Sequence, residues 1–191
     1  WELNRKGEEY LVSKGDFESA YQKFMESTKE DPHFVVPLLN LARINIAFND
    51  NKDAEVFAGK AARLSPGDPD VLVVLARIAI NESRYDAASG LLEKCLVKSP
   101  NSAQCLGWKG ILARRMKKSG EAEKNLTKSV ELDPDNLHFR IELARACFDN
   151  KNPDGFYRHC NEALVYAISR NREDMALYIR MLLREKSEKR I

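Results

Sequence analysis

Few residues in this chain favour tight turns: there are 9 Gly and 7 Pro among 191 residues. A β-sandwich or barrel depends on many short strands joined by such turns, so the scarcity of both residues argues against an all-β fold. Disorder is also excluded, because hydrophobic residues make up 43% of the chain. The composition favours a helical chain that folds as one domain or as one array of small units.

The sequence also lacks long apolar runs and an excess of one charge. The longest apolar candidate, residues 71–80, is interrupted by Arg77 and is far shorter than the roughly 20 residues that a bilayer requires. Lys and Arg number 31 against 29 Asp and Glu, which gives a formal net charge of +2. Such a chain has no strong field to attract phosphate groups. We therefore expect neither a membrane span nor a nucleic-acid partner.

Residues that form metal and catalytic sites are scarce. The chain has 3 His and 4 Cys, and neither a Cys-x-x-Cys nor a His-x-x-x-His spacing occurs, so we expect no metal site. Gly-rich phosphate loops and nucleophile-elbow motifs are absent as well. We therefore expect no cofactor and no enzymatic activity in this chain, and a catalytic domain elsewhere in a longer polypeptide stays open.

What the sequence does contain is a repeat of fixed length. Four of its prolines recur every 34 residues, at Pro32, Pro66, Pro100 and Pro134. Proline cannot continue a helix and restricts the residue before it, so each of these prolines marks the end of a helix. A fixed period of this length is typical of an array of helix pairs.

The same period places small side chains at three positions of each repeat, counted from residue 1. Two helices that pack closely need small residues where their backbones approach. We therefore expect these positions to form the contact between the two helices of a repeat. They are Ala42, Ala76, Gly110 and Ala144 at position 8; Ala20, Ala54, Ala88 and Ala122 at position 20; and Ser27, Ala61, Cys95, Ser129 and Ala163 at position 27.

Two segments carry a family resemblance: KGDFESAYQKF at 14–24 and SVELDPDN at 129–136 resemble tetratricopeptide (TPR) repeats. The resemblance implies an all-α fold, a right-handed superhelical solenoid of antiparallel helix pairs. It divides the chain into five repeats, 1–34, 35–68, 69–102, 103–136 and 137–170, followed by a C-terminal capping helix and tail, 171–191. On the capping helix we expect one apolar stripe, made of Met175, Tyr178, Ile179, Leu182 and Leu183.

The chain departs from the family pattern in places. The Gly15 that joins the two helices of the first repeat is replaced by Asn49, Ser83 and Lys117 in the next three repeats. The fifth repeat has no closing Pro, and it carries Phe156 where the other repeats have a small residue. We expect this last repeat to pack irregularly.

The resemblance also implies where a partner binds. In this family the first helix of each repeat lines a concave face. Arg recurs at position 9 of the repeats, so Arg43, Arg77 and Arg145 are expected to form a ladder there. Arginine binds carboxylates in a bidentate manner, and tryptophan is enriched in binding hot spots. The expected partner-binding residues are Leu39, Asn40, Arg43, Val73, Arg77, Ile80, Trp108, Ile111, Arg114, Arg145 and Phe148.

A packing role is the alternative for each of these residues. An arginine on a repeat helix can pair with an acidic residue of the neighbouring repeat, and Trp108 can fill the core between two repeats. One specialised role is disfavoured. Some members of the family hold chaperone tails with a two-carboxylate clamp, but Glu9 and Asp70 would repel an incoming carboxylate here.

These observations favour a non-catalytic protein-protein interaction module, an adaptor or scaffold, that binds an acidic, amphipathic peptide or helix of another protein in its concave groove. Two alternatives stay open. The chain could be a structural module that forms a homo-oligomer through its terminal repeats. It could also be an accessory TPR protein of bacterial envelope or pilus assembly, an analogy that rests on the fold alone.

The 4 cysteines bear on the compartment. The preferred interpretation is that all are free and behave as small buried residues, and a cytoplasmic location is then favoured. The alternative is a periplasmic or secreted chain with a Cys147/Cys160 or a Cys95/Cys105 disulfide, because the repeat places the members of each pair near each other.

Overall fold

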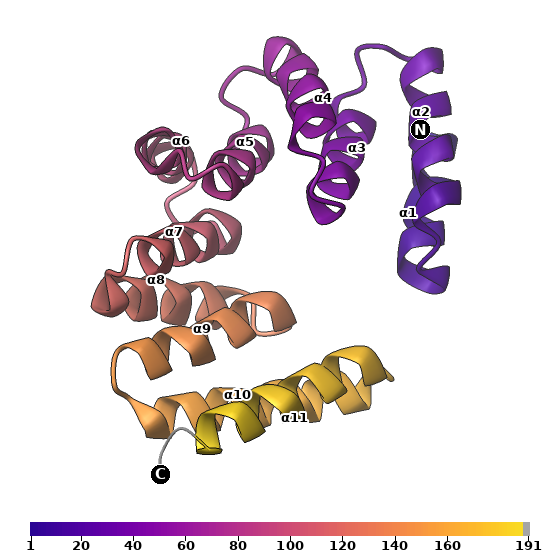
Figure 1. The fold of residues 1–191 in the computed structure, drawn as a ribbon. Helices are drawn as coiled ribbons and strands as arrows, with labels where there is room; N and C mark the ends of the chain where they lie inside the picture. Colours follow the sequence, from indigo (N-terminus) through magenta and orange to yellow (C-terminus); the bar gives the residue numbers. More distant parts are fainter. Residues whose placement is uncertain (189–191) are drawn as a thin grey trace. The chain divides into compact units, whose positions relative to one another are not determined.

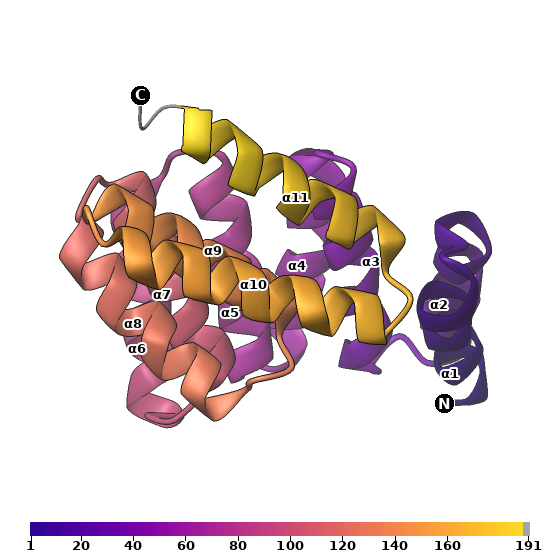
Figure 2. The same ribbon diagram turned by 90° about the horizontal axis from the view of Figure 1, so that it is seen from below.

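The structure is a computed structural model that describes residues 1–188 of the chain. Every regular element in that range is helical: there are eleven α-helices and one π-helical turn. The chain divides into two compact units, Trp1–Ser99 and the residues from Pro100 onward. Within each unit the helices follow one another as antiparallel pairs (Figure 1, Figure 2). The predicted all-α fold is confirmed.

Unit 1 contains three helix pairs. In each pair the first helix packs on the second, and the second packs on the first helix of the next pair. The elements are α1 (Glu2–Glu9), continued by the π-helical turn Tyr10–Lys14, α2 (Phe17–Glu30), α3 (Val35–Ala47), α4 (Asn51–Leu64), α5 (Pro69–Asn81) and α6 (Tyr85–Lys98).

Unit 2 contains two helix pairs and one further helix. The pairs pack on each other as in unit 1, and the last helix packs on the second pair. The elements are α7 (Ala103–Arg115), α8 (Ser119–Leu132), α9 (Leu137–Asp149), α10 (Pro153–Ser169) and α11 (Glu173–Glu188). The helices α3, α5, α7 and α9 therefore begin at the 34-residue spacing of the sequence repeat. Among the described residues, no helix has the length and apolar character needed to cross a membrane.

Side-chain caps explain where many of these helices begin. The Asp50 carboxylate accepts a hydrogen bond from the backbone N–H of Asp53 at 3.2 Å, and Asp68 does the same for Asp70 at 2.8 Å. In unit 2, Ser102 caps α7. Each cap satisfies a backbone donor that the first turn of a helix leaves without a partner.

The turns inside the repeats share one backbone conformation. The residue at position 15 has a positive φ in all five repeats: 61° at Gly15, 60° at Asn49, 59° at Ser83, 59° at Lys117 and 58° at Lys151. The following backbone N–H then bonds a carbonyl five residues back, as from Asp50 to Asn45 at 2.8 Å. This pattern closes helices in many proteins and normally uses glycine. The turn thus has the same conformation in the four repeats that lack a glycine at this position.

The small residues predicted at positions 8, 20 and 27 are all buried. In unit 1, Ala20, Ala42 and Ala54 are fully buried, and the larger Phe24 and Leu41 fill the space beside them. The predicted contact between the two helices of a repeat is therefore confirmed. Its apolar area supplies the main favourable contribution to folding.

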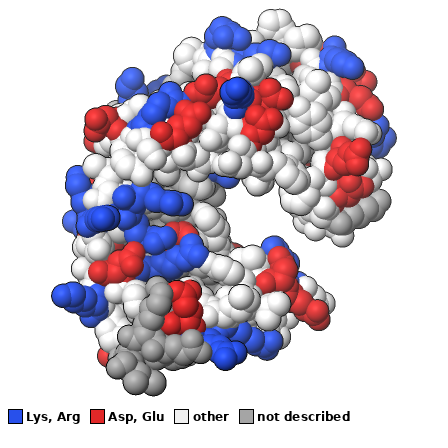
Figure 3. Space-filling model, in the orientation of Figure 1, with Lys and Arg blue, Asp and Glu red and all other residues white. Residues whose placement is uncertain are grey.

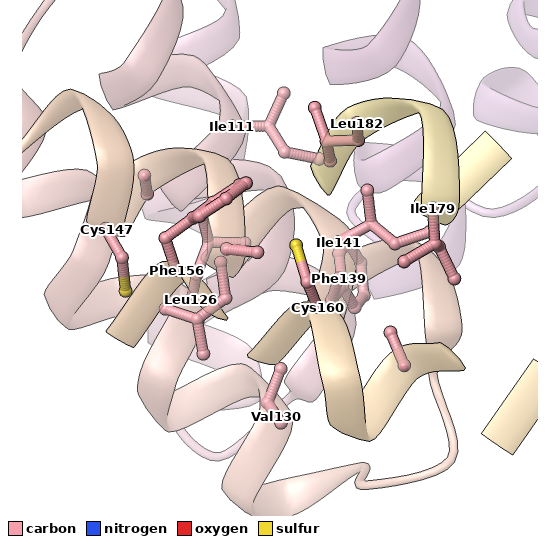
Figure 4. Close-up of a cluster of buried hydrophobic side chains, with 14 of the residues drawn as sticks. Ile111, Leu126, Val130, Phe139, Ile141, Cys147, Phe156, Cys160, Ile179 and Leu182 are labelled. Atoms are coloured by element: carbon pink, nitrogen blue, oxygen red, sulfur yellow. The ribbon is translucent and has the colours of Figure 1, made fainter. Parts of the chain in front are cut away.

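In unit 2 the buried side chains of successive helices form one cluster (Figure 4). Leu126 of α8, Phe139 of α9, Phe156 of α10 and Ile179 of α11 are each at most 1% exposed. Phe156 occupies the position where the other repeats have alanine, and α10 has 17 residues against 14 in α8. The fifth repeat is thus irregular, as predicted, but its large side chain is absorbed by the core.

The predicted apolar stripe of the last helix faces this cluster. Ile179 and Leu182 are buried in it, and Met175, Tyr178 and Leu183 pack against it. The tail residues 189–191 lie outside the described residues. On the face shown in Figure 3, basic and acidic side chains are interspersed, in keeping with the balanced composition.

Replacing Lys117 by glycine should stabilise the protein. Lys117 has a φ of 59°, a conformation that costs a residue with a Cβ about 1–2 kcal/mol and glycine almost nothing. After the loss of chain entropy in glycine, we expect Lys117→Gly to raise the free energy of unfolding by about 0.5–1 kcal/mol in urea denaturation. The control Lys124→Gly, inside α8, should lower it by about 1 kcal/mol. Equal losses from both variants would contradict the assignment of the turn.

Candidate functional site

The residues predicted to bind a partner lie on the first helices of the repeats. In unit 1, α3 contacts α5, and in unit 2, α7 contacts α9. The first helices of a unit therefore lie side by side and share a surface. α11 follows α10 in the manner of a further first helix, and its Tyr178 contacts α9.

Trp108 lies where α7 meets α9. Its half-buried ring lies 5.5 Å from the ring of His138 and 6.1 Å from that of Phe139, which it meets edge to face. His138 is exposed, whereas Phe139 is fully buried. Trp108 therefore contacts a core side chain, Phe139, and an exposed imidazole, His138.

Glu142 of α9 joins arginines from two helices. Its side chain is only 9% exposed and accepts a hydrogen bond from Arg114 Nε at 3.1 Å and from Arg145 Nη1 at 2.5 Å. Arg114 also reaches Asp149 at 3.4 Å. Charge-assisted hydrogen bonds of this kind hold a guanidinium group in a fixed orientation.

Arg145 extends this set of contacts to α11. Its guanidinium carbon lies 5.5 Å from the centre of the Tyr178 ring, a cation–π contact. Polar and aromatic side chains of α7, α9 and α11 are thus linked in two sets of contacts, Trp108 with His138 and Arg114 through Glu142 and Arg145 to Tyr178. We refer to them as the aromatic–arginine row, which consists of Trp108, His138, Arg114, Glu142, Arg145 and Tyr178.

The corresponding surface of unit 1 is a polar network. Asn40 donates to Asn4 at 3.3 Å and to Glu8 at 3.4 Å, and it accepts from Arg43 at 3.1 Å. Arg43 also lies 3.9 Å from Asp70 on α5. The amide of Asn40 is therefore engaged inside the unit, and Arg43 pairs with the neighbouring repeat in the way that the packing alternative describes.

The Arg77 side chain is more buried than expected for an arginine in a ladder that faces a ligand. It is half-buried, and burial, together with the nearby charge of Arg43, lowers the pKa of Arg77 to about 10. Arg43 and Arg77 are thus neighbours in unit 1. Arg145 belongs to unit 2.

Most of the apolar residues that were predicted to contact a partner expose little of their surface to solvent. Leu39, Val73, Ile80 and Ile111 are 4–5% exposed, so any contact with a partner is limited to their edges. Phe148 is half-buried, with its ring 5.5 Å from that of Phe156.

Glu142, Asp149 and Tyr178 are not among the residues that were expected to bind a partner. A signal for Glu142 was present, because it lies at position 6 of a repeat and Arg114 at position 12 of the preceding one. Opposite charges on adjacent first helices are placed to pair. Among the described residues, no group of His, Cys, Asp and Glu side chains is arranged to hold a metal ion.

A sequence model of the family described as Tetratricopeptide repeat matches residues 103–136, which form α7 and α8. The same helix pair recurs through both units. Residues 103–136 are thus a tetratricopeptide repeat, and the chain as a whole has the TPR fold.

The TPR chain is also similar to part of a much longer protein. It is 28% identical over 170 residues to human protein O-mannosyl-transferase TMTC3, a match that covers 81% of this chain and 19% of that protein. The mouse protein of the same name is 28% identical over 149 residues. The chain therefore spans about a fifth of the length of these curated relatives.

Solved TPR structures share the fold. The thermophilic TPR protein TTC0263 from Thermus thermophilus has a TM-score of 0.83 at 19% identity, and the match covers 95% of this chain and 97% of that one. For pilF of Pseudomonas aeruginosa the TM-score is 0.66 at 19% identity, with 96% and 90% covered. YrrB has a TM-score of 0.55 at 14% identity, with 94% and 90% covered. At these identities the likeness establishes the fold alone.

The cysteines differ from the preferred prediction of four free thiols. Cys95 and Cys105 are disulfide-bonded, and Cys147 and Cys160 are free. The prediction is therefore wrong for Cys95 and Cys105. Both residues are fully buried. The alternative Cys147/Cys160 disulfide is not formed.

Cys147 contributes to a contact that anchors the turn between α9 and α10. Its Sγ donates to Glu123 at 3.5 Å, and the same carboxylate accepts from Asn150 at 2.7 Å and from Asn152 at 2.8 Å. Burial and the Glu123 carboxylate raise the pKa of Cys147 to about 12, and burial raises the pKa of Cys160 to about 11. Both thiols are therefore protonated at neutral pH and poor nucleophiles.

Alkylation with iodoacetamide tests this assignment. In native protein at pH 8 we expect no modification, because the two free thiols are buried and protonated. In guanidinium chloride without reductant we expect two modified cysteines by mass spectrometry, Cys147 and Cys160. After reduction all four should react. Four modifications without reductant, or rapid modification of the native protein, would contradict the structure.

Proposed function

We propose that this chain is a non-catalytic interaction module that binds an acidic, amphipathic peptide or helix of another protein on the aromatic–arginine row of unit 2. The TPR fold supports a role as a protein-interaction scaffold. The proposal adds the surface, which is α7, α9 and α11, and the chemistry of the partner.

The observation that carries the proposal is that α7 and α9 carry both a half-buried Trp108 and two arginines oriented by Glu142. Trp108 is half-buried with its ring against His138 at 5.5 Å, so it is rigid and partly accessible, as binding hot spots are. Arg114 and Arg145 keep 21% and 31% of their side-chain surface exposed while Glu142 fixes their orientation. An apolar side chain can pack on the tryptophan while carboxylates approach the arginines.

Two similarities support an interaction role. YrrB, similar in fold, is described as a TPR protein with an unusual peptide-binding site. TMTC3 is named as an O-mannosyl-transferase, and this chain matches only a fifth of it. We propose that a chain of this kind contributes binding, and that the transfer of a sugar in such a protein belongs to other parts of the polypeptide.

Affinity capture with the wild-type chain and the Trp108→Ala variant tests the proposal. Partners recovered by the wild type are measured against both chains by calorimetry. We expect Trp108→Ala to weaken binding about 30-fold, the equivalent of about 2 kcal/mol, with an unchanged helical circular dichroism spectrum. The matched control is Trp1→Ala, because Trp1 is 80% exposed and belongs to unit 1.

Equal binding by all three chains would contradict a site on the row. Loss of helical signal in Trp108→Ala would assign the residue to the core, and Arg145→Gln, at a more exposed position, then carries the test. Sedimentation of the wild type in the same buffer separates the alternative of self-association, for which Leu177 and Met181 of α11 offer exposed apolar side chains.

A further inference from the structure

Unit 1 contains a hollow that is lined mainly by its second helices. It lies between α2 and α4, has a volume of about 320 Å³, and includes Pro32 from the turn that follows α2. Leu38 and Phe57, which are 4% and 8% exposed, form its floor. Met25 and Leu64 line its walls and are half-buried. The hollow therefore offers an apolar floor with partly accessible apolar walls.

The charged residues at the rim of this hollow are all basic. Lys60 and Arg63 of α4 line it and are exposed, and no acidic residue belongs to its lining. The Lys60 ammonium lies 5.6 Å from the centre of the Phe57 ring, which keeps it above the floor. Among the described residues, neither Lys60 nor Arg63 takes part in an ion pair.

The same place in unit 2 is also a hollow, but an internal ion pair belongs to its lining. Three repeat periods further along the chain, Arg140 stands where unit 1 has Leu38, and Glu162 stands where it has Lys60. Arg140 donates to Glu162 at 2.5 Å and to the Pro134 carbonyl at 2.7 Å, and its side chain is only 15% exposed. In unit 2 the chain thus supplies both a basic side chain in the lining of the hollow and an acidic side chain that pairs with it.

Unit 1 lacks this internal ion pair, because Leu38 and Lys60 stand in place of Arg140 and Glu162. With leucine in place of Arg140, no side chain of the floor reaches up to the rim. With lysine in place of Glu162 and Arg63 in place of Val165, the charge of the rim is positive and has no internal counterpart. An apolar floor below two basic groups is complementary to an apolar side chain flanked by carboxylates.

We propose that the hollow between α2 and α4 is a second binding site, which takes an acidic segment of a partner protein with one bulky apolar side chain. The apolar side chain sits on Leu38 and Phe57, and neighbouring Asp or Glu carboxylates pair with Lys60 and Arg63. Burial of the apolar side chain supplies most of the affinity, because exposed ion pairs contribute little. The charges select acidic sequences over neutral ones. This site does not depend on the aromatic–arginine row.

Selection of 12-residue peptides from a phage-displayed random library, in 150 mM salt, tests the proposal with a defined probe. The targets are the wild-type chain, the Lys60→Glu/Arg63→Glu variant and the control Lys94→Glu/Lys124→Glu. Both variants change the net charge equally, and all four lysine and arginine positions are exposed. We expect the wild type and the control to enrich peptides in which a large apolar residue adjoins Asp or Glu, and the Lys60→Glu/Arg63→Glu variant to lose them.

The affinity of one selected peptide, measured by fluorescence polarisation, should fall at least tenfold in Lys60→Glu/Arg63→Glu. It should stay within twofold in Trp108→Ala, which separates this site from the row in unit 2. Failure to enrich acidic apolar peptides would overturn the proposal. So would their retention by Lys60→Glu/Arg63→Glu, or their loss in Trp108→Ala alone.

A second variant tests the apolar wall rather than the basic rim. Met25→Glu places a carboxylate beside Lys60 and Arg63, in imitation of the internal acid of unit 2, and Met25 is only half-buried. We expect this variant to keep its helical circular dichroism spectrum and to lose the selected peptides. Unchanged binding by Met25→Glu would place the peptides elsewhere on the protein.

Discussion

The close approach of two helices within each repeat is the constraint on which the rest of this structure depends. It is made by small residues at positions 8, 20 and 27, and in the fourth repeat it leaves no room for a methyl group. A Cβ on Gly110 would lie 2.5 Å from Leu126 Cγ and 3.1 Å from the Leu126 backbone nitrogen. A side chain can shift to make room, but the backbone of α8 cannot shift without moving the pair. Alanine is tolerated at this position in other repeats, so the spacing differs slightly between pairs.

Both candidate binding surfaces follow from this packing. The small residues hold the two helices of each pair together. The first helices of neighbouring pairs then lie side by side, and their polar side chains contact one another. Glu142 between Arg114 and Arg145 is one such meeting, and Asn40 with Asn4 is another. The second helices leave a hollow between repeats. The residue at position 4 of the following repeat decides whether its lining carries an internal ion pair, as with Arg140, or an apolar floor, as with Leu38.

The regular features of the fold were predictable from the sequence, and the specific contacts were not. The period of the prolines and of the small residues predicts the helix pairs because each signal acts within one repeat. The left-handed turn survives at Ser83, Lys117 and Lys151 because the helices on both sides hold the backbone in place. The π-helical turn at Tyr10–Lys14, the burial of Phe156 and the pairing of Glu142 depend on neighbouring elements in three dimensions. A single sequence gives no direct account of those distances, so Leu39 and Val73 were expected at a surface that in fact leaves them buried.

Thermal unfolding of Gly110→Ala beside Gly90→Ala tests the central constraint most directly. The added methyl group is the same in both variants, and both sites lie in helices, where alanine is favoured over glycine by up to about 1 kcal/mol. A Cβ on Gly90 would have no atom within 4 Å, so Gly90→Ala should gain stability. Gly110→Ala should lose about 1–3 kcal/mol, because the methyl group has to push α7 and α8 apart. If both variants gain stability alike, the close approach of the helices is not what limits the residue at this position.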